Sequence, residues 1–140
     1  MRRILLRIHQ GLAWVILVGL LLQFYSVRMA LFAAASFEFH RTLGYFLAVP
    51  VILLLVLALA GRLGRFLIGL SALLVVLTIL QAALPSLRAS VPMLAALHPV
   101  NAVALLGVSA VIVRQARGEL LERSQTSSSS SRVEGYSGFD

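Results

Sequence analysis

The chain contains no cysteine and no lysine, and only 12% of its 140 residues are charged. The absence of cysteine excludes disulfides, iron–sulfur clusters and thiol chemistry. The sequence also offers no nucleophile–base pair, no carboxylate pair and no phosphate-binding loop, which leaves hydrolytic and kinase chemistry without catalytic groups. These absences make an enzyme the less favoured interpretation.

Long apolar runs dominate the composition. Hydrophobic residues make up 60% of the chain and the mean hydropathy is +0.97, which indicates a membrane protein. About 20 apolar residues in a helix span the hydrocarbon, and four segments fit, at residues 8–25, 42–60, 66–84 and 94–113. The sequence has no long stretch in which apolar and polar residues alternate, as a transmembrane β-barrel would require. In lipid every backbone polar group needs a partner within the protein, so these apolar runs are expected to be helices. The sequence predicts an all-α integral membrane four-helix bundle over residues 1–118.

The C-terminal segment, residues 119–140, differs from the rest in being polar. It includes an unbroken serine run at residues 127–131. Such a run buries no apolar area, so the sequence predicts a disordered tail.

The arginines set the expected orientation. Eight of them flank the ends that carry the two termini and the connection at residues 61–65, whereas Arg28, Arg41 and Arg88 lie on the opposite side. The positive-inside rule then places both termini in the cytoplasm, in a multi-pass protein of a bacterial inner membrane. The net charge of +7 is explained by the orientation of the protein in the membrane and by contact with lipid headgroups. The sequence has no basic segment with interleaved aromatic residues, so nucleic-acid binding is not expected.

A signal peptide is the competing interpretation of the first 35 residues. Arg2-Arg3, an apolar stretch and three alanines at residues 33–35 imitate its three parts. The apolar stretch is longer than the usual 7–15 residues of such a region, and cleavage would remove half of an internal repeat. The segment is therefore predicted to be a retained helix.

That repeat has an offset of 58 residues. Its rare residue types recur in the same order and spacing: Arg7, Gly11, Gln23 and His40 match Arg65, Gly69, Gln81 and His98. Internal repetition points to duplicated structural units. Because each copy contains two spans, both enter the membrane with the same orientation. The sequence predicts two tandem helical hairpins with pseudo-two-fold symmetry about the membrane normal.

The repeat places polar side chains at the outer ends of all four spans. Gln23 and Gln81 end the first and third spans, while His40 and His98 begin the second and fourth. Equivalent helices are expected to lie diagonally, so these four side chains should meet at one depth. One interfacial histidine is usually a headgroup contact. Two at repeat-equivalent positions favour a shared ligand, because polar groups within a membrane are costly and commonly functional.

The favoured ligand is one haem b with His40 and His98 as axial ligands. Gly44 and Ala102, one turn inward from the two histidines, would leave space for the flat macrocycle. Arg41, together with Arg28 or Arg88, is suited to pair with propionates. Side chains expected to orient the imidazoles or carboxylates are Gln23, Gln81 and Asn101.

Other ligands are less favoured. Zinc would lack ligands, because Glu38 is the only acid on that side of the membrane. A chlorophyll-type pigment, which takes one histidine per magnesium, stays open as an alternative. His9 lies near the cytoplasmic end and has Leu67 as its repeat equivalent, so it is interpreted as an interfacial residue.

Pro50 lies in the middle of the second span. It lacks an N–H and is expected to bend that helix, whereas its repeat equivalent Val108 should leave the fourth span without this bend.

Two short motifs carry a resemblance to known families. Phe-His-Arg-Thr-Leu-Gly-Tyr at residues 39–45 and Leu-His-Pro-Val-Asn-Ala at residues 97–102 resemble helix-end histidine motifs of small bacterial four-helix b-type cytochromes. They loosely resemble haem A synthase, and are also similar to uncharacterised bacterial membrane families. The resemblance covers residues 5–115 and implies a duplicated helical fold with haem at helix ends. Haem A synthase has two four-helix halves, so synthase activity is not implied.

Two functions follow as expectations. The first is electron transfer with a quinone or a membrane redox complex near the outer face. The second is a non-catalytic accessory or structural subunit of a larger membrane complex, which includes a pigment-binding subunit.

Overall fold

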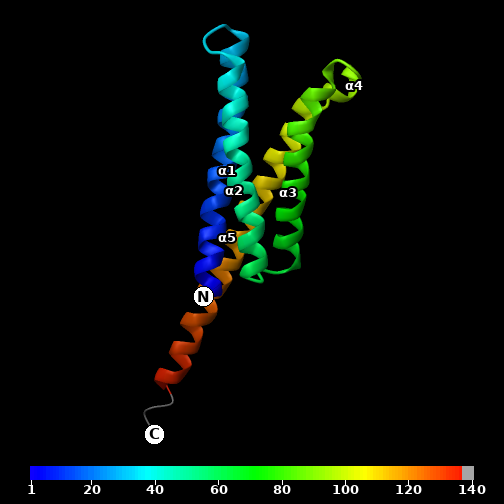
Figure 1. The fold of residues 1–140 in the computed structure, drawn as a ribbon. Coiled ribbons are helices and arrows are strands. Elements are labelled where there is room, and N and C mark those ends of the chain that lie inside the picture. Colours follow the sequence, from blue (N-terminus) through cyan, green and yellow to red (C-terminus); the bar gives the residue numbers. More distant parts are fainter. Residues whose placement is uncertain (137–140) are drawn as a thin grey trace.

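Four long helices form the bundle in the computed structural model, which describes residues 1–136. They are α1 (Arg2–Leu31), α2 (Phe37–Ala60), α3 (Arg65–Ala83) and α5 (His98–Tyr136), and the short helices η1 (Leu84–Arg88) and α4 (Pro92–Ala95) join α3 to α5 (Figure 1). Four helical segments are long and apolar enough to cross a membrane: Arg2–Leu31, Phe37–Ala60, Arg65–Arg88 and Pro92–Glu122. The predicted all-helical class and the four spans are thereby confirmed, and they indicate a multi-pass membrane protein.

Two tight turns end α1 and α2 in the same manner. Ala33 and Arg62 adopt positive φ angles of 57° and 46° just after each helix. Ala34 N–H donates to the Met29 carbonyl, and Leu63 N–H donates to the Ala58 carbonyl, so each turn closes as a Schellman motif. These caps let each helix reverse direction within a few residues.

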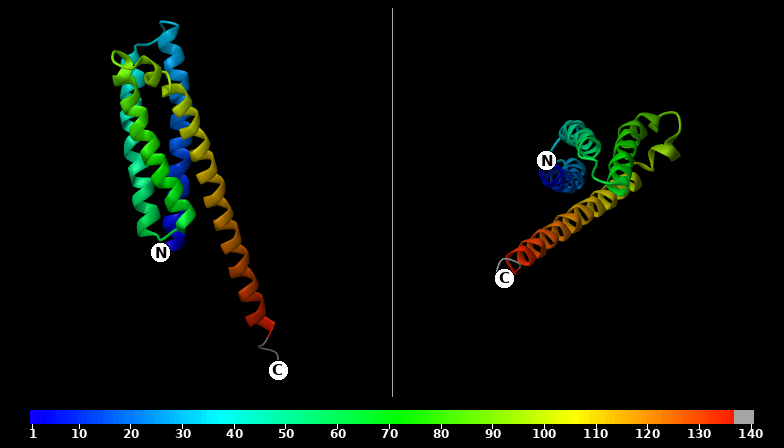
Figure 2. Two further views of the ribbon diagram at one scale, coloured as in Figure 1. Left: turned by 90° about the vertical axis from the view of Figure 1, so that its right-hand side faces the viewer. Right: turned by 90° about the horizontal axis from the view of Figure 1, so that it is seen from below.

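The helices pack in the circular order α1, α2, α3, α5. Both α1 and α3 pack against α2 and α5, so α1 lies diagonally opposite α3, and α2 lies diagonally opposite α5. Buried aliphatic residues from all four helices fill the centre, including Leu6, Leu54, Leu74 and Ile112. The α1–α2 turn and α4 lie at one end of the bundle, and the N-terminus and the α2–α3 turn lie at the other (Figure 2). Toward the end that carries α4, the α1–α2 pair and the α3–α5 pair diverge (Figure 1).

The connections are more helical than the sequence predicted. Helix α1 continues past Tyr25 to Leu31 and α2 begins at Phe37, because the added residues 26–31 and 37–41 include no glycine or proline. The second connection holds η1 and α4, each of which begins at or next to a proline.

Helix α5 is also longer than expected. Its backbone stays helical to Tyr136, so the boundary drawn at residue 118 is not a break in the helix. Serine has moderate helix propensity and no proline follows Pro99, so no strong helix breaker ends the element earlier. Residues 137–140 lie outside the described residues, and the disorder expected for the tail stays a prediction.

Pro50 lies inside α2, which continues without interruption from Phe37 to Ala60. The bend of α2 at Pro50 stays a prediction.

Candidate cofactor site

Two histidines face each other across the bundle. His40 lies in the first turn of α2, His98 is the first residue of α5, and these helices occupy diagonal positions. Their ring centres lie 6.4 Å apart and the ring planes are inclined by 71°. The structure therefore brings together the two side chains that the repeat paired.

Ser26 on α1 fixes the orientation of the His40 ring. The Ser26 hydroxyl donates to the Gln23 carbonyl at 2.8 Å, so its oxygen lone pairs are available to the His40 Nδ1 at 2.9 Å. Nδ1 must then carry the proton, which leaves a lone pair on Nε2. Among the described residues no hydrogen bond engages that Nε2 atom.

His98 has the same tautomer for a different reason. Its Nδ1 lies 3.1 Å from the backbone carbonyl of Gln81, and because a carbonyl only accepts, Nδ1 is the donor. Nε2 then holds the lone pair and accepts from the Gln81 side-chain amide at 3.2 Å. Each imidazole thus donates through Nδ1 and presents Nε2 as an acceptor.

Asn101 holds the Gln81 side chain in place. Its amide donates to the Leu77 carbonyl at 2.9 Å and to Gln81 Oε1 at 2.6 Å. With Oε1 engaged, the amide nitrogen of Gln81 is directed to His98. Asn101, Gln81 and His98 are thus joined in one chain of hydrogen bonds, and the supporting role of Gln81 and Asn101 beside a cofactor stays a prediction.

Gly44 makes room for the other glutamine. A Cβ atom at this position would lie 2.9 Å from Gln23 Nε2, so the Gln23 side chain extends across the space left on α2. Ser26 also lies 3.3 Å from Gln23 Oε1, which ties Gln23 to the partner of His40.

A cavity of about 680 Å³ opens beside both histidines. Pockets of roughly 300–1,000 Å³ accommodate small molecules and cofactors. Six of the predicted site residues line the cavity: Gln23, His40, Arg41, Gly44, Gln81 and His98. Its wall also includes Arg88 and aromatic or aliphatic side chains from all four long helices.

Two predicted residues lie beside this lining rather than in it. Asn101 contacts the site through Gln81, and Ala102 is half-buried on α5, where Pro99 and Leu105 form the wall instead. Arg41 is exposed and bonds to Glu38 at 2.6 Å, so its guanidinium is already paired at the mouth of the cavity. The contribution predicted for Ala102 stays a prediction.

The interpretation of His9 as an interfacial residue is wrong. Its side chain is fully buried, and its Nε2 lies 3.2 Å from Ser71 Oγ on the diagonally opposite α3. The Ser71 hydroxyl donates to the Leu67 carbonyl, so its oxygen accepts from His9 Nε2–H. His9 Nδ1 has no hydrogen-bond partner among the described residues. This contact was missed because the repeat pairs His9 with Leu67 and Ser71 with Ala13, and it gives no information about contacts between positions that are not repeat-equivalent.

Ser26 was missed for a simpler reason. It is a common residue without a repeat equivalent, since the matching position is Leu84. The available signal was helical spacing, because Ser26 follows Gln23 by three residues and so lies on the same face of α1.

The candidate site offers two imidazoles as possible metal ligands. Within residues 1–136, the described side chains include no group of three or more His, Cys, Asp or Glu that could hold a metal ion. A haem iron, already held by its macrocycle, takes at most two axial ligands from the protein.

Comparison with known proteins gives one partial match. Residues 23–88 match the model of a family of unknown function, DUF6220. The matched segment begins at Gln23, includes His40 and Gln81, and ends before His98. No curated protein and no solved structure matches the chain.

Proposed function

We propose that the protein binds one haem b between His40 and His98 and transfers electrons near the outer end of the bundle. The observation that carries the proposal is the relation of the two imidazoles, whose centres lie 6.4 Å apart and which both donate through Nδ1, so that each Nε2 holds a lone pair, that of His98 in contact with the Gln81 amide. A metal–imidazole bond of about 2.0 Å, with roughly 1.15 Å from nitrogen to ring centre, separates two trans imidazoles by about 6.3 Å. The observed separation fits one metal ion between them.

The hydrogen bonds at Nδ1 support the same ligand. Metal-bound histidines usually donate their second ring nitrogen to a carbonyl, carboxylate or water, which fixes the ring and increases its basicity. The Gln81 carbonyl does this for His98, and Ser26 Oγ does it for His40. Metal binding at His98 requires the Gln81 amide to move off Nε2.

The charged residues at the mouth suit the two propionates. Arg41 and Arg88 line the cavity, and a guanidinium pairs well with a carboxylate. A propionate at Arg41 would share this guanidinium with Glu38 or displace it. When bound, the haem supplies one-electron oxidation and reduction of its iron. The surrounding residues bind it, orient it and keep its inner part away from water.

The proposal includes the membrane arrangement. Two tandem hairpins, related by pseudo-two-fold symmetry about the membrane normal, place the site at the outer face of a bacterial inner membrane with both termini cytoplasmic. Support comes from the diagonal positions of repeat-equivalent helices and from the arginine distribution. An alkaline phosphatase fusion after Ser90 should be active and one after Arg62 inactive; the reverse pattern would invert the orientation.

The direct test is haem content. The full chain, expressed with supplemental haem and purified in detergent, should hold one haem per chain and show a low-spin spectrum on reduction. A colourless preparation would refute the proposal and leave the accessory-subunit function.

A further inference from the structure

The two imidazoles of the candidate site share a tautomer but differ at Nε2. Nε2 of His98 accepts a hydrogen bond from the Gln81 side-chain amide at 3.2 Å. Among the described residues no hydrogen bond engages Nε2 of His40. Both rings are half-buried, so a difference in exposure does not explain the difference in bonding. One Nε2 atom is therefore open to a metal ion, and the other is already occupied.

A departure from the internal repeat creates this asymmetry. Gln23 is the repeat equivalent of Gln81, but its side-chain oxygen lies 3.3 Å from a serine hydroxyl of its own helix, and among the described residues it has no hydrogen bond to a histidine. Gln81 points to His98 because Asn101 donates to its Oε1 at 2.6 Å. The residue that matches Asn101 in the first copy is Leu43, which has no side-chain donor. The amide that directs Gln81 is thus present in the second copy alone.

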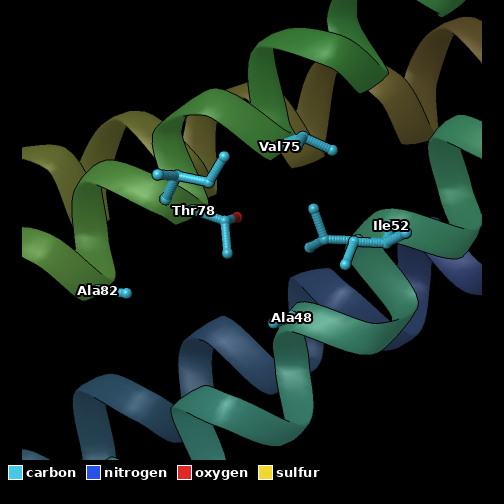
Figure 3. Close-up of a pocket in the computed structure, with 7 residues that line it drawn as sticks. Ala48, Ile52, Val75, Thr78 and Ala82 are labelled. Atoms are coloured by element: carbon cyan, nitrogen blue, oxygen red, sulfur yellow. The ribbon is translucent and has the colours of Figure 1, made fainter.

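The space that adjoins the cavity offers no donor in place of the Gln81 amide. A hollow of about 180 Å³ between α2 and α3 meets the cavity at Ala48, Thr78 and Ala82, which line both spaces. Figure 3 shows these short side chains around the hollow. Apart from Thr78 its lining is aliphatic, and the Thr78 hydroxyl already donates to a backbone carbonyl of α3 at 2.8 Å. Without the Gln81 side chain, no group in this hollow would donate to His98.

We infer that Gln81 makes His98 the exchangeable ligand of the metal and leaves His40 as the permanent one. The inference rests on the proposed function and adds a difference between its two axial positions. The single lone pair on His98 Nε2 either accepts from the amide or binds iron. The Gln81 amide, held by Asn101, therefore stabilises the His98 ring when it is off the metal. The net contribution of such a hydrogen bond changes an equilibrium about two- to tenfold.

The exchange balances without a further reagent. The bond from iron to His98 Nε2 breaks, a bond from iron to a small uncharged ligand forms, and neither an electron nor a proton is transferred. The His98 lone pair then accepts from the Gln81 amide. His40 stays bound, because no donor among the described residues competes for its Nε2. The probe for the external ligand is carbon monoxide, which binds ferrous haem at an open axial position.

The first test needs no haem. Diethyl pyrocarbonate acylates an imidazole nitrogen that holds a free lone pair, and peptide mass spectrometry of the haem-free full chain gives a rate for each histidine. We expect Gln81→Leu to increase the His98 rate about two- to tenfold and to leave the His40 rate unchanged. The ring stays in place, because the backbone carbonyl of residue 81 still accepts from His98 Nδ1. Gln10→Leu, the same substitution outside the cavity, is the matched control and should leave both rates unchanged.

Two results of this measurement would overturn the inference. One is an unchanged His98 rate in Gln81→Leu. The other is an equal increase at His98 and His40, which would report a loosened bundle. If Gln81→Leu folds poorly, Asn101→Ala takes its place under the same criterion, because it releases Gln81 Oε1 and should also raise the His98 rate.

The second test uses the haem-loaded chain, reduced with dithionite and titrated with carbon monoxide. Gln81→Leu should bind carbon monoxide about two- to tenfold more weakly than wild type, because its His98 is no longer stabilised off the iron. Gln10→Leu should bind it as tightly as wild type. A haem-bound chain with equal affinities in wild type and Gln81→Leu would overturn the exchange and leave the proposed function intact. A colourless chain would refute the proposed function and the exchange together.

Discussion

The ring centres of His40 and His98 lie 6.4 Å apart although 58 positions separate the two residues in the sequence. Each ring is held by a residue of the preceding long helix, Ser26 of α1 for His40 and Gln81 of α3 for His98. The helices that carry the rings are diagonal in the bundle, so the rings approach from opposite sides of its centre.

Replacing either histidine should remove the cofactor. His40→Ala and His98→Ala would each delete one of the two proposed axial ligands, so we expect haem content after purification to fall by about tenfold or more. The measurement is the haem-to-protein ratio from the pyridine haemochrome spectrum. Phe39→Ala, an exposed neighbour that does not line the cavity, is the control and should keep its haem. Full haem content in the double variant His40→Ala/His98→Ala would show that these residues are not the ligands.

Ser26→Ala should change the redox potential more than the haem content. The Ser26 oxygen accepts from His40 Nδ1–H, and this bond makes the imidazole a stronger electron donor to ferric iron. Its loss should raise the midpoint potential, and Ser26→Thr, which keeps the hydroxyl, should restore it. Ser90→Ala is the control, because Ser90 is exposed and bonds only to the Leu87 carbonyl. An unchanged potential in Ser26→Ala would contradict this role.

Two glycines within helices, Gly44 on α2 and Gly69 on α3, should respond differently to alanine. Gly44→Ala places a methyl group 2.9 Å from Gln23 Nε2 and forces that side chain to move, so haem affinity should fall. Gly69→Ala meets nothing within 4 Å and should stabilise α3 by about 0.5–1 kcal/mol through the better helix propensity of alanine. Haem titration and equilibrium unfolding in mixed micelles measure the two effects. Equal behaviour in both assays would mean that Gly44 has no specific place in the site.

His9 should matter for stability and not for the spectrum. His9→Ala removes a fully buried side chain and its bond to Ser71, so we expect a loss of about 1–3 kcal/mol in the free energy of unfolding. A double-mutant cycle with Ser71→Ala should give a coupling of about 0.6 kcal/mol, as measured for hydrogen bonds between membrane helices. A changed haem spectrum in His9→Ala would refute its assignment to the packing of α1 against α3.

The sequence predicted the parts of the fold that depend on hydrophobicity and repetition. The four spans follow from apolar runs, and the meeting of His40 with His98 follows from repeat-equivalent positions at one depth. The length of α5 did not follow, because serine neither stabilises nor strongly breaks a helix.

Contacts that lack repeat equivalents also escaped prediction. Ser26 and Ser71 are common residues whose partners, His40 and His9, are set by the rotation of neighbouring helices about their axes. The apolar pattern specifies this rotation poorly, since nearly every face of these helices is hydrophobic.

The angle of 71° between the two imidazole planes gives the most direct test. Imidazoles that bound a haem iron at this angle would leave two iron d orbitals close in energy, which would make a low-spin ferric signal strongly anisotropic. The measurement is low-temperature electron paramagnetic resonance of the oxidised full chain. We predict one strongly anisotropic low-spin signal per chain, which is lost in the double variant His40→Ala/His98→Ala. A high-spin signal, or no haem signal from a chain purified out of haem-supplemented cells, would contradict the bis-histidine site.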